Sequence, residues 1–148
     1  MTIRIDDILK SKSEKIITVL PDDSLYSAIQ EMVNHNIGSV LVVSREDELV
    51  GIITERDVLK QCVRRSDRLK TTVVESVMTT DLIIGLPNDS VDYLVGVMTT
   101  NKIRHIPILT DGKIQGIVSI GDLLKSQMKA VEYENRYLKD YISGKYPA

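Results

Sequence analysis

A hydroxyl residue followed three positions later by a carboxylate occurs twice in this sequence, each time after a glycine and two apolar residues. The copies are Gly51-Ile52-Ile53-Thr54-Glu55-Arg56-Asp57 and Gly116-Ile117-Val118-Ser119-Ile120-Gly121-Asp122. At a corner between a strand and a helix, such a pair can hydrogen-bond the two hydroxyls of a ribose, as acidic residues do in dinucleotide-binding folds. The same spacing fits a helix N-cap with an acid that returns to the cap, so both interpretations stay open.

A basic segment precedes a predicted strand in the second half of the chain, Lys102-Ile103-Arg104-His105-Ile106-Pro107. Arginine, lysine and histidine side chains bind phosphate oxygens through charge-assisted hydrogen bonds. The segment therefore suits a phosphate group. A solvated strand edge is the alternative, because basic residues are common there.

Residues that catalyse reactions or hold metals are otherwise sparse. The two histidines and the single cysteine, Cys62, lie far apart and give no zinc-binding spacing, and no carboxylate cluster suits a metal ion. Cys62 falls on an apolar helical face with Val58, Leu59 and Val63, which predicts a packed thiol. We therefore expect no catalytic residue and no enzymatic activity.

The chain repeats itself once, which gives the two hydroxyl-carboxylate motifs equivalent positions. Pro21-Asp22-Asp23-Ser24 returns as Pro87-Asn88-Asp89-Ser90, 66 residues later, and the spacing becomes 65 residues at the second motif. The lost residue falls in a predicted hairpin turn, where loop length varies at little cost. Gly38-Ser39 stands where the second repeat has Arg104-His105, so we expect two sites with unequal ligands or affinities.

Each repeat predicts the same order of elements, β-α-β-β-α. A short apolar strand closed by a proline comes first, and a helix capped by Ser24 or Ser90 follows. Two strands joined by a polar turn and a second helix complete the unit. The predicted strands are 16–20, 39–43 and 49–53, then 82–86, 105–109 and 114–118, and the second helices begin near Glu55 and Ile120.

One repeat of about 55 residues buries little apolar area alone, so the two should pack their sheets together about a pseudo-twofold axis, with paired clefts between them. The predicted fold belongs to the mixed α/β (α+β) class. We expect the first repeat over residues 8–65, a linker over 66–76, the second repeat over 77–126 and a C-terminal helical extension over 127–148.

Length and composition fit one small soluble domain. With 148 residues, 43% hydrophobic content and a net charge of -2, the chain has no global positive field to hold a nucleic-acid backbone. A single cysteine permits no internal disulfide, and the first residues are acidic where a signal peptide needs an apolar stretch. No apolar run approaches the roughly 18 residues that cross a bilayer. We expect a cytoplasmic protein and no membrane partner.

The motifs and their order resemble a tandem pair of cystathionine-β-synthase (CBS) domains, also called a Bateman module, from about Ile8 to Lys125. The similarity rests on the β-α-β-β-α order, the Pro-x-x-Ser start of the first helix and the Gly-apolar-apolar-(Thr or Ser)-x-x-Asp signature, each present twice. Val77-Met78-Thr79 matches the segment that usually precedes a repeat. Small stand-alone bacterial CBS pairs are the most similar. The chain departs at Ile84-Gly85, where the family usually has Thr-Val.

The resemblance implies a ligand that contains adenosine, such as AMP, ADP, ATP, NAD(H) or S-adenosylmethionine, with its adenine between apolar strand residues. Carried onto this chain, it implies one ribose at Thr54 and Asp57 and another at Ser119 and Asp122. The phosphate contacts it implies are Arg56, Arg104 and His105, and the further candidate ligand residues are Lys12, Ser13, Ser39 and Ile106.

From Ile120 onward, apolar positions predict a helix that runs to Gly144 and is longer than the repeat needs. Tyr133, Tyr137 and Tyr141 make an aromatic stripe along it. Such a stripe can stack bases, but packing on the domain or on a second subunit is the favoured interpretation. The resembled family commonly forms disc-like homodimers, so we expect a homodimer in which this helix adds buried area.

The sequence therefore predicts a non-catalytic regulatory module that binds an adenine nucleotide between its repeats and acts on an unidentified protein as an energy or redox sensor. Two alternatives stay open. One is an interaction protein whose clefts are empty. The other is a nucleic-acid-binding accessory protein that uses Arg64, Arg65, Arg68 and Lys70 of the linker, although such a local patch is usually a solvated connector.

Overall fold

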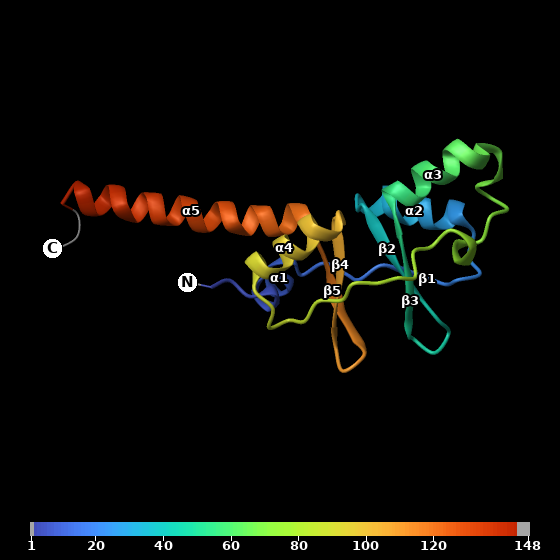
Figure 1. Ribbon diagram of the computed structural model, residues 1–148, viewed down its shortest axis with the longest axis horizontal. Helices are drawn as coiled ribbons and strands as arrows, with labels where there is room; N and C mark the ends of the chain where they lie inside the picture. Colours follow the sequence, from blue (N-terminus) through green and yellow to red (C-terminus); the bar gives the residue numbers. More distant parts are fainter. Residues whose placement is uncertain (1, 145–148) are drawn as a thin grey trace.

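The computed structural model describes residues 2–144, in which two repeats lie side by side and a long final helix extends from the second (Figure 1). The elements of the first repeat are β1 (Thr18–Val19), α2 (Leu25–His35), β2 (Ser39–Val43), β3 (Leu49–Thr54) and α3 (Glu55–Arg65). β1 pairs in parallel with β2, and β2 pairs antiparallel with β3. The predicted order is confirmed, with a first strand of two residues in place of five.

The second repeat has the same order but lacks a regular first strand. Its elements are α4 (Val91–Asn101), β4 (His105–Thr110), β5 (Lys113–Ser119) and α5 (Ile120–Ile142), and β4 pairs antiparallel with β5. In place of the predicted strand over 82–86, Gly85 alone forms a parallel bridge with Ile108. A Cβ at Gly85 would lie 2.8 Å from Ile108 Cδ1, so this close approach requires a glycine.

Serine side chains begin the first helix of each repeat, as predicted. Ser24 Oγ accepts the Ser27 amide at 3.0 Å, and Ser90 Oγ accepts the Tyr93 amide at 3.1 Å. Each cap satisfies an amide that the first turn of a helix would otherwise leave unpaired. The two helices therefore begin at equivalent positions of the repeat.

Each repeat has its own aliphatic core, and a segment that precedes the other repeat completes it. Helix α1 (Ile5–Lys12), which the sequence analysis did not predict, buries Ile5 and Ile8 in the core of the second repeat. The short helix η2 (Val74–Ser76) of the linker buries Val74 in the core of the first repeat. The chain therefore crosses between the repeats before each of them.

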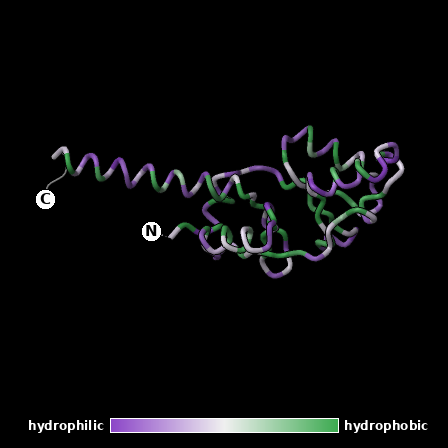
Figure 2. The backbone as a smooth tube through the Cα atoms, turned by 45° about the horizontal axis from the view of Figure 1, so that its top comes forward, coloured by the Kyte–Doolittle hydropathy of each residue, from purple (hydrophilic) through white to green (hydrophobic). Residues whose placement is uncertain are grey.

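The final helix α5 packs on its repeat only at its beginning. Leu123 is fully buried, and Gln127 Nε2 donates to Asp92 Oδ1 of α4 at 2.8 Å. Beyond this point α5 projects away from both repeats (Figure 1), with apolar and polar residues alternating along it (Figure 2). It ends at Ile142, and Gly144 takes φ +84°, as the predicted stop requires. The last four residues of the expected extension, 145–148, lie outside the described residues.

The apolar face predicted for α3 is not packed. Leu59 is 65% exposed and Val63 is 88% exposed, because no segment among the described residues covers this side of the helix. Cys62 is half-buried. The interpretation of a closely packed face around the thiol is therefore wrong for Leu59 and Val63.

Candidate functional site

Both hydroxyl-carboxylate motifs form capping boxes. Thr54 Oγ1 accepts the Asp57 amide at 3.3 Å, and Asp57 Oδ2 accepts the Thr54 amide at 3.0 Å. In the second motif, Ser119 Oγ accepts the Asp122 amide at 3.1 Å, and Asp122 Oδ2 accepts the Ser119 amide at 2.9 Å. The capping interpretation is confirmed at both positions, so a role in ligand binding depends on the carboxylate oxygens that remain.

At the first motif, both oxygens of Asp57 are already engaged. Thr79 Oγ1 lies 3.2 Å from Asp57 Oδ1 and 3.3 Å from Oδ2, and Thr54 Oγ1 donates to Oδ2 at 3.1 Å. Thr79 is held there by two backbone hydrogen bonds with Ile52, at 2.9 and 3.0 Å. The entry segment of the second repeat, 77–79, therefore closes over the first motif.

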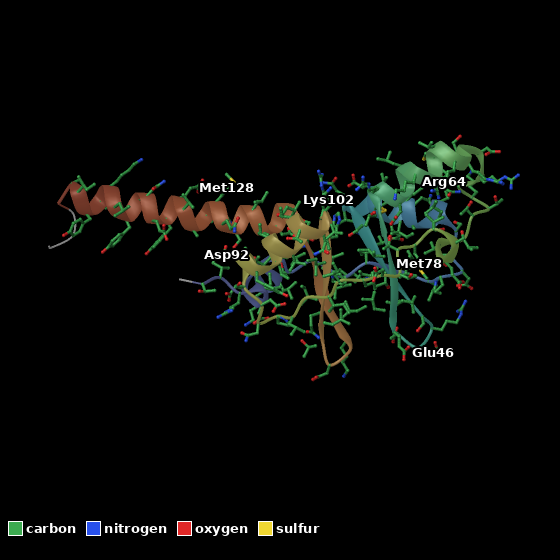
Figure 3. The ribbon with its side chains drawn as sticks, in the orientation of Figure 1. Glu46, Arg64, Met78, Asp92, Lys102 and Met128 are labelled. Carbon is green, nitrogen blue, oxygen red and sulfur yellow. The ribbon has the colours of Figure 1, made fainter. Side chains whose placement is uncertain are left out.

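The neighbouring Met78 strengthens this closure. Figure 3 shows Met78 beside the first repeat, and a Cβ at Gly51 would lie 2.6 Å from Met78 Sδ. The methionine thus packs directly on the strand backbone that leads to Thr54. The glycine of the signature is needed here for the entry segment of the second repeat to approach the strand.

At the second motif, Asp122 is engaged on one oxygen only. Lys12 Nζ lies 2.8 Å from Asp122 Oδ2 and also donates to the Ile117 carbonyl at 3.0 Å. Within residues 2–144, the hydrogen bonds to the carboxylate of Asp122 all reach Oδ2, so Oδ1 keeps its capacity to accept a donor. This carboxylate oxygen is the clearest difference between the two motifs.

Electrostatics keep Asp122 ionised. Burial of the side chain raises its pKa, but the hydrogen bond from Lys12, the Ser119 amide and the lysine charge outweigh burial and hold the pKa of Asp122 below its usual value. At neutral pH the residue is therefore a carboxylate, which accepts hydrogen bonds from hydroxyl groups.

A cavity of about 340 Å³ lies beside Asp122, between the two repeats. Its size falls within the range of small-molecule sites, roughly 300 to 1,000 Å³. The walls combine aliphatic side chains with charged and amide groups from both repeats. Its apolar lining includes Leu9, Ile16, Ile17, Ile37, Leu41 and Ile117, and its polar lining includes Lys12, Glu14, Lys15, His35, Asn36, Ser39, His105, Gln115, Ser119 and Asp122.

His105 joins the two repeats at the cavity wall. A Cβ on Gly38 would lie 3.0 Å from His105 Nε2 and 2.7 Å from Glu55 Oε1, so both side chains occupy the space that this glycine leaves. Burial lowers the pKa of His105, against the charges of Glu55 and Asp122, which raise it. The imidazole is therefore neutral at pH 7 and can donate and accept one hydrogen bond each.

The structure brings together five of the residues predicted for the ligand site. Lys12, Ser39, His105, Ser119 and Asp122 all line the cavity. Thr54 and Asp57 belong instead to the closed first motif.

The remaining candidates lie outside the cavity lining. Arg56 and Arg104 are exposed, and the side chain of Ile106 is fully buried in the core of the second repeat. Ser13 ends α1 in the left-handed conformation, with φ 41°. None of these four residues contributes to the lining of the cavity.

Sequence reasoning missed Lys15, Asn36 and Gln115, which also line the cavity. Lys15 follows Lys12 on the segment that crosses between the repeats. Its place in the cavity lining could be predicted only from the course of that segment. Asn36 ends α2 at φ 52°, a conformation that asparagine adopts more easily than most residues. No sequence signal connected Gln115 with the site.

Three of the four basic residues predicted as a patch share one hollow. Arg64, at the outer end of α3 (Figure 3), lines an open hollow of about 310 Å³ together with Arg65 and Arg68. Lys70 lies elsewhere, with Nζ 5.0 Å above the ring of Tyr26. Lys70 is therefore not part of the lining of this hollow.

The part of the chain that the structure describes has neither a metal-binding cluster nor a membrane-spanning helix. Residues 2–144 contain no group of three or more histidine, cysteine, aspartate or glutamate side chains that could hold a metal ion. In the same residues, no helix is both long enough and apolar enough to cross a membrane.

The sequence model of the CBS domain matches this chain twice, over residues 5–64 and 74–129. The mitochondrial CBS domain-containing protein CBSX3 of Arabidopsis thaliana is 36% identical over 96% of this chain and 73% of its own length. YhcV of Bacillus subtilis, also a CBS domain-containing protein, is 34% identical over 77% of this chain and 80% of its own length. An inosine-5'-monophosphate dehydrogenase of Methanocaldococcus jannaschii is 36% identical, but over only 21% of that enzyme.

Solved structures show the same fold. A CBS-domain containing protein from Agrobacterium tumefaciens superposes with a TM-score of 0.81 at 32% identity, over 85% of this chain and 93% of its own. The CBS domain pair of protein MJ0100, solved with 5'-methylthioadenosine and S-adenosyl-L-methionine, gives a TM-score of 0.77 at 26% identity, over 88% of this chain and 99% of its own. With two family matches that together span both cores and the cavity between them, this chain belongs to the CBS domain family.

Proposed function

We propose that this CBS pair is a regulatory module that binds an adenosine-containing ligand in the cavity beside Asp122. The observation that carries the proposal is the free Oδ1 of an ionised aspartate at a cavity of about 340 Å³ between the repeats. A carboxylate oxygen in this position suits a ribose hydroxyl, and Ser119 supplies a hydroxyl beside it.

The rest of the lining suits the other parts of such a ligand. Ile17, Ile37 and Ile117 provide aliphatic walls for adenine. Lys12, Lys15 and His105 provide donors for a phosphate group or for another anionic substituent. The related CBS pair of MJ0100 was solved with two adenosine derivatives, which supports an adenosine group as the common feature of the ligand.

The first motif is a second, weaker site in this proposal. A ribose at Thr54 and Asp57 must displace Thr79 from the carboxylate, which costs the hydrogen bonds that Thr79 makes. Arg56 and Arg104, both exposed, are the phosphate contacts proposed for it. We therefore expect the two sites to differ in affinity, with the site at Asp122 filling first.

Regulation follows if ligand binding changes the preferred arrangement of the two repeats. Because the cavity is lined from both repeats, a ligand that fits one arrangement better stabilises that arrangement by its difference in binding free energy. An energy or redox sensor acting on another protein, a homodimeric state, a non-catalytic role and a cytoplasmic location all remain part of the proposal.

The test is calorimetric titration of nucleotide-free protein with AMP, ADP, ATP, NADH, S-adenosylmethionine and 5'-methylthioadenosine. Asp122→Ala is expected to weaken binding by about 5- to 150-fold, the equivalent of 1 to 3 kcal/mol. Asp57→Ala is the matched comparison, because it removes a capping-box acid that does not line the cavity, and it is expected to leave the tighter binding step at Asp122 unchanged and to affect only the weaker second step. Both variants lose a helix cap. Equal losses of affinity at the Asp122 site would therefore show that the weaker binding comes from damage to the fold and not from a lost contact with the ligand.

Two results would reject the proposal. One is the absence of binding for all six compounds while wild-type protein is folded. The other is unchanged affinity in folded Asp122→Ala protein, which would leave Asp122 as a helix cap and direct attention to an interaction protein with empty clefts.

A further inference from the structure

The projecting part of α5 carries a regular apolar row. Its residues recur at alternating spacings of four and three, a pattern with a mean period of 3.5 residues, from the second turn to the end of the helix. All are exposed in the single chain: Leu124 (45%), Met128 (63%), Val131 (55%), Leu138 (54%) and Ile142 (83%), with Asn135 completing the row.

This row is distinct from the side of α5 that contacts its own repeat. Leu123 is buried, Gln127 bonds to Asp92, and Ala130 is half-buried. Met128 lies on the other side of the same turn and points into the open (Figure 3). The chain therefore uses one face of α5 for its own core and leaves a neighbouring face without an intramolecular partner among the described residues.

In a heptad written abcdefg, the row falls on positions a and d. Met128, Asn135 and Ile142 take a, whereas Leu124, Val131 and Leu138 take d. The part of α5 that stands away from its domain, from Met128 to Ile142, is only about 15 residues long, and an isolated helix of that length is marginally stable in water. A partner that covers positions a and d would stabilise it.

We infer that α5 forms a parallel, in-register, two-stranded coiled coil with α5 of a second copy of this chain. The inference deepens the homodimer proposed above and rests on it. It is independent of the nucleotide site, because no residue of the heptad row lines the cavity.

Asn135 supports this partner and this register. A single asparagine at an a position lowers the stability of a coiled coil but favours two parallel strands, in which the asparagines of both chains meet and hydrogen-bond. In a shifted register, Asn135 would face an aliphatic residue and its amide would be buried without a partner. The asparagine therefore selects against other registers.

The charges beside the row support a parallel orientation. Glu134 falls on position g and Lys139 on the following e position. In a parallel pair, each Glu134 faces the partner's Lys139, which gives two symmetric attractive contacts. An antiparallel pair that matches g with g brings Glu134 to the partner's Glu134, which is repulsive.

The aromatic stripe lies outside this contact. Tyr133 takes position f, Tyr137 takes c and Tyr141 takes g. Tyr133 is 71% exposed, so packing of the stripe on its own domain is not what the structure shows. In the coiled coil, the tyrosines border the dimer and do not form its centre.

Cysteine cross-linking tests orientation and register. In a full-length Cys62→Ser background, Leu138→Cys places a thiol at a d position, where the two copies meet only if the helices are parallel and in register. Oxidation is expected to link most of the chains as dimers on a non-reducing gel. Tyr133→Cys, at the outward f position, is the matched control and is expected to stay largely monomeric. Equal linking of both variants, or none for Leu138→Cys, would overturn the inference.

Charge exchange tests the partner's contacts without changing the core. Glu134→Lys and Lys139→Glu are each expected to weaken self-association by about 2- to 10-fold in sedimentation equilibrium, and the double variant is expected to restore it. Circular dichroism checks that each variant keeps its helix content. A self-association constant that is the same in wild type and in all three variants would contradict the coiled coil.

The same measurements separate this inference from the proposed homodimer. A chain that is monomeric at every concentration would reject both. A dimer that is insensitive to the α5 variants but dissociates in Val63→Asp, on the exposed face of α3, would reject the coiled coil and keep the homodimer. Nucleotide titration of the double charge variant is expected to match wild type in either case.

Discussion

Lys12 Nζ and Asp122 Oδ2 lie 2.8 Å apart although 110 residues separate them in the sequence. The lysine ends the helix α1, and the aspartate stands in the first turn of α5. Their contact fixes the segment that crosses between the repeats against the second motif. It therefore forms one edge of the cavity and sets the charge of its carboxylate.

Removal of this lysine should change the titration of Asp122. In Lys12→Gln, burial still raises the pKa of Asp122, but the opposing hydrogen bond and charge are lost, so the pKa is expected to rise. In wild type, stability from this residue is present above the usual aspartate value of 3.8 and is lost as the pH falls through the lowered pKa. The variant should therefore lose less stability than wild type as the pH falls through this range, because its folded pKa no longer lies as far below the unfolded value.

Carboxyl-carbon NMR of Asp122 measures this shift, and Lys10→Gln serves as the control because Lys10 pairs with Asp6 on the exposed side of α1. An unchanged Asp122 titration in Lys12→Gln would show that Lys12 does not lower the pKa of Asp122.

His105 should make stability depend on pH in a higher range. Its pKa is lowered by burial, so between that value and the usual 6.5 the unfolded chain binds a proton that the folded chain does not. Stability is therefore full above about 6.5 and declines as the pH falls below it. His105→Gln is expected to flatten this decline in urea unfolding at pH 5 to 7, whereas His35→Gln, on the exposed end of α2, should retain it.

Thr79→Val should open the first motif. Valine has a similar shape but cannot donate to Asp57, so Oδ1 of the carboxylate becomes available for a ligand while Oδ2 still accepts from Thr54. Affinity at this site is expected to rise by about 5- to 10-fold, the equivalent of one hydrogen bond. Calorimetric stoichiometry should then move from one ligand per chain toward two, and the exposed neighbour Thr80→Val should leave it at one.

Two glycines should respond in opposite directions to alanine. At Gly51, an added Cβ would lie 2.6 Å from Met78 Sδ and 3.1 Å from the Thr79 carbonyl, so Gly51→Ala is expected to destabilise the fold by about 1 to 3 kcal/mol. At Gly96, nothing lies within 4 Å, so Gly96→Ala is expected to stabilise α4 by about 0.5 to 1 kcal/mol. Thermal unfolding of both variants checks the signs.

The repeat made most of the fold predictable. Proline, serine caps and alternating apolar strands recur at fixed spacing, and these local signals determined where α2, α3, α4 and α5 begin. Helix α1 was missed because its apolar residues, Ile5 and Ile8, pack against the other repeat, and no local pattern reports such a distant contact. The strand expected over 82–86 is only one bridge, between Gly85 and Ile108, because the segment approaches its own repeat closely at the glycine alone.

The site was predictable in residue type but not in geometry. Because the two motifs are equivalent in sequence, Asp57 and Asp122 were equally good candidates for binding a ribose. Their difference comes from what precedes each repeat, a threonine that satisfies one carboxylate and a lysine that leaves an oxygen of the other free. That difference depends on how two segments cross, which requires the three-dimensional structure.

The crossing of α1 and of the linker between the repeats also determines how the protein unfolds. Ile5 and Ile8 complete the core of the second repeat, and Val74 completes the core of the first. Each repeat therefore loses part of its core when the other repeat unfolds. Unfolding should therefore proceed as a single cooperative event with coincident transitions in both halves. A cut in the linker should yield two fragments that are unstructured when separate and recover the native state only as a complementing pair.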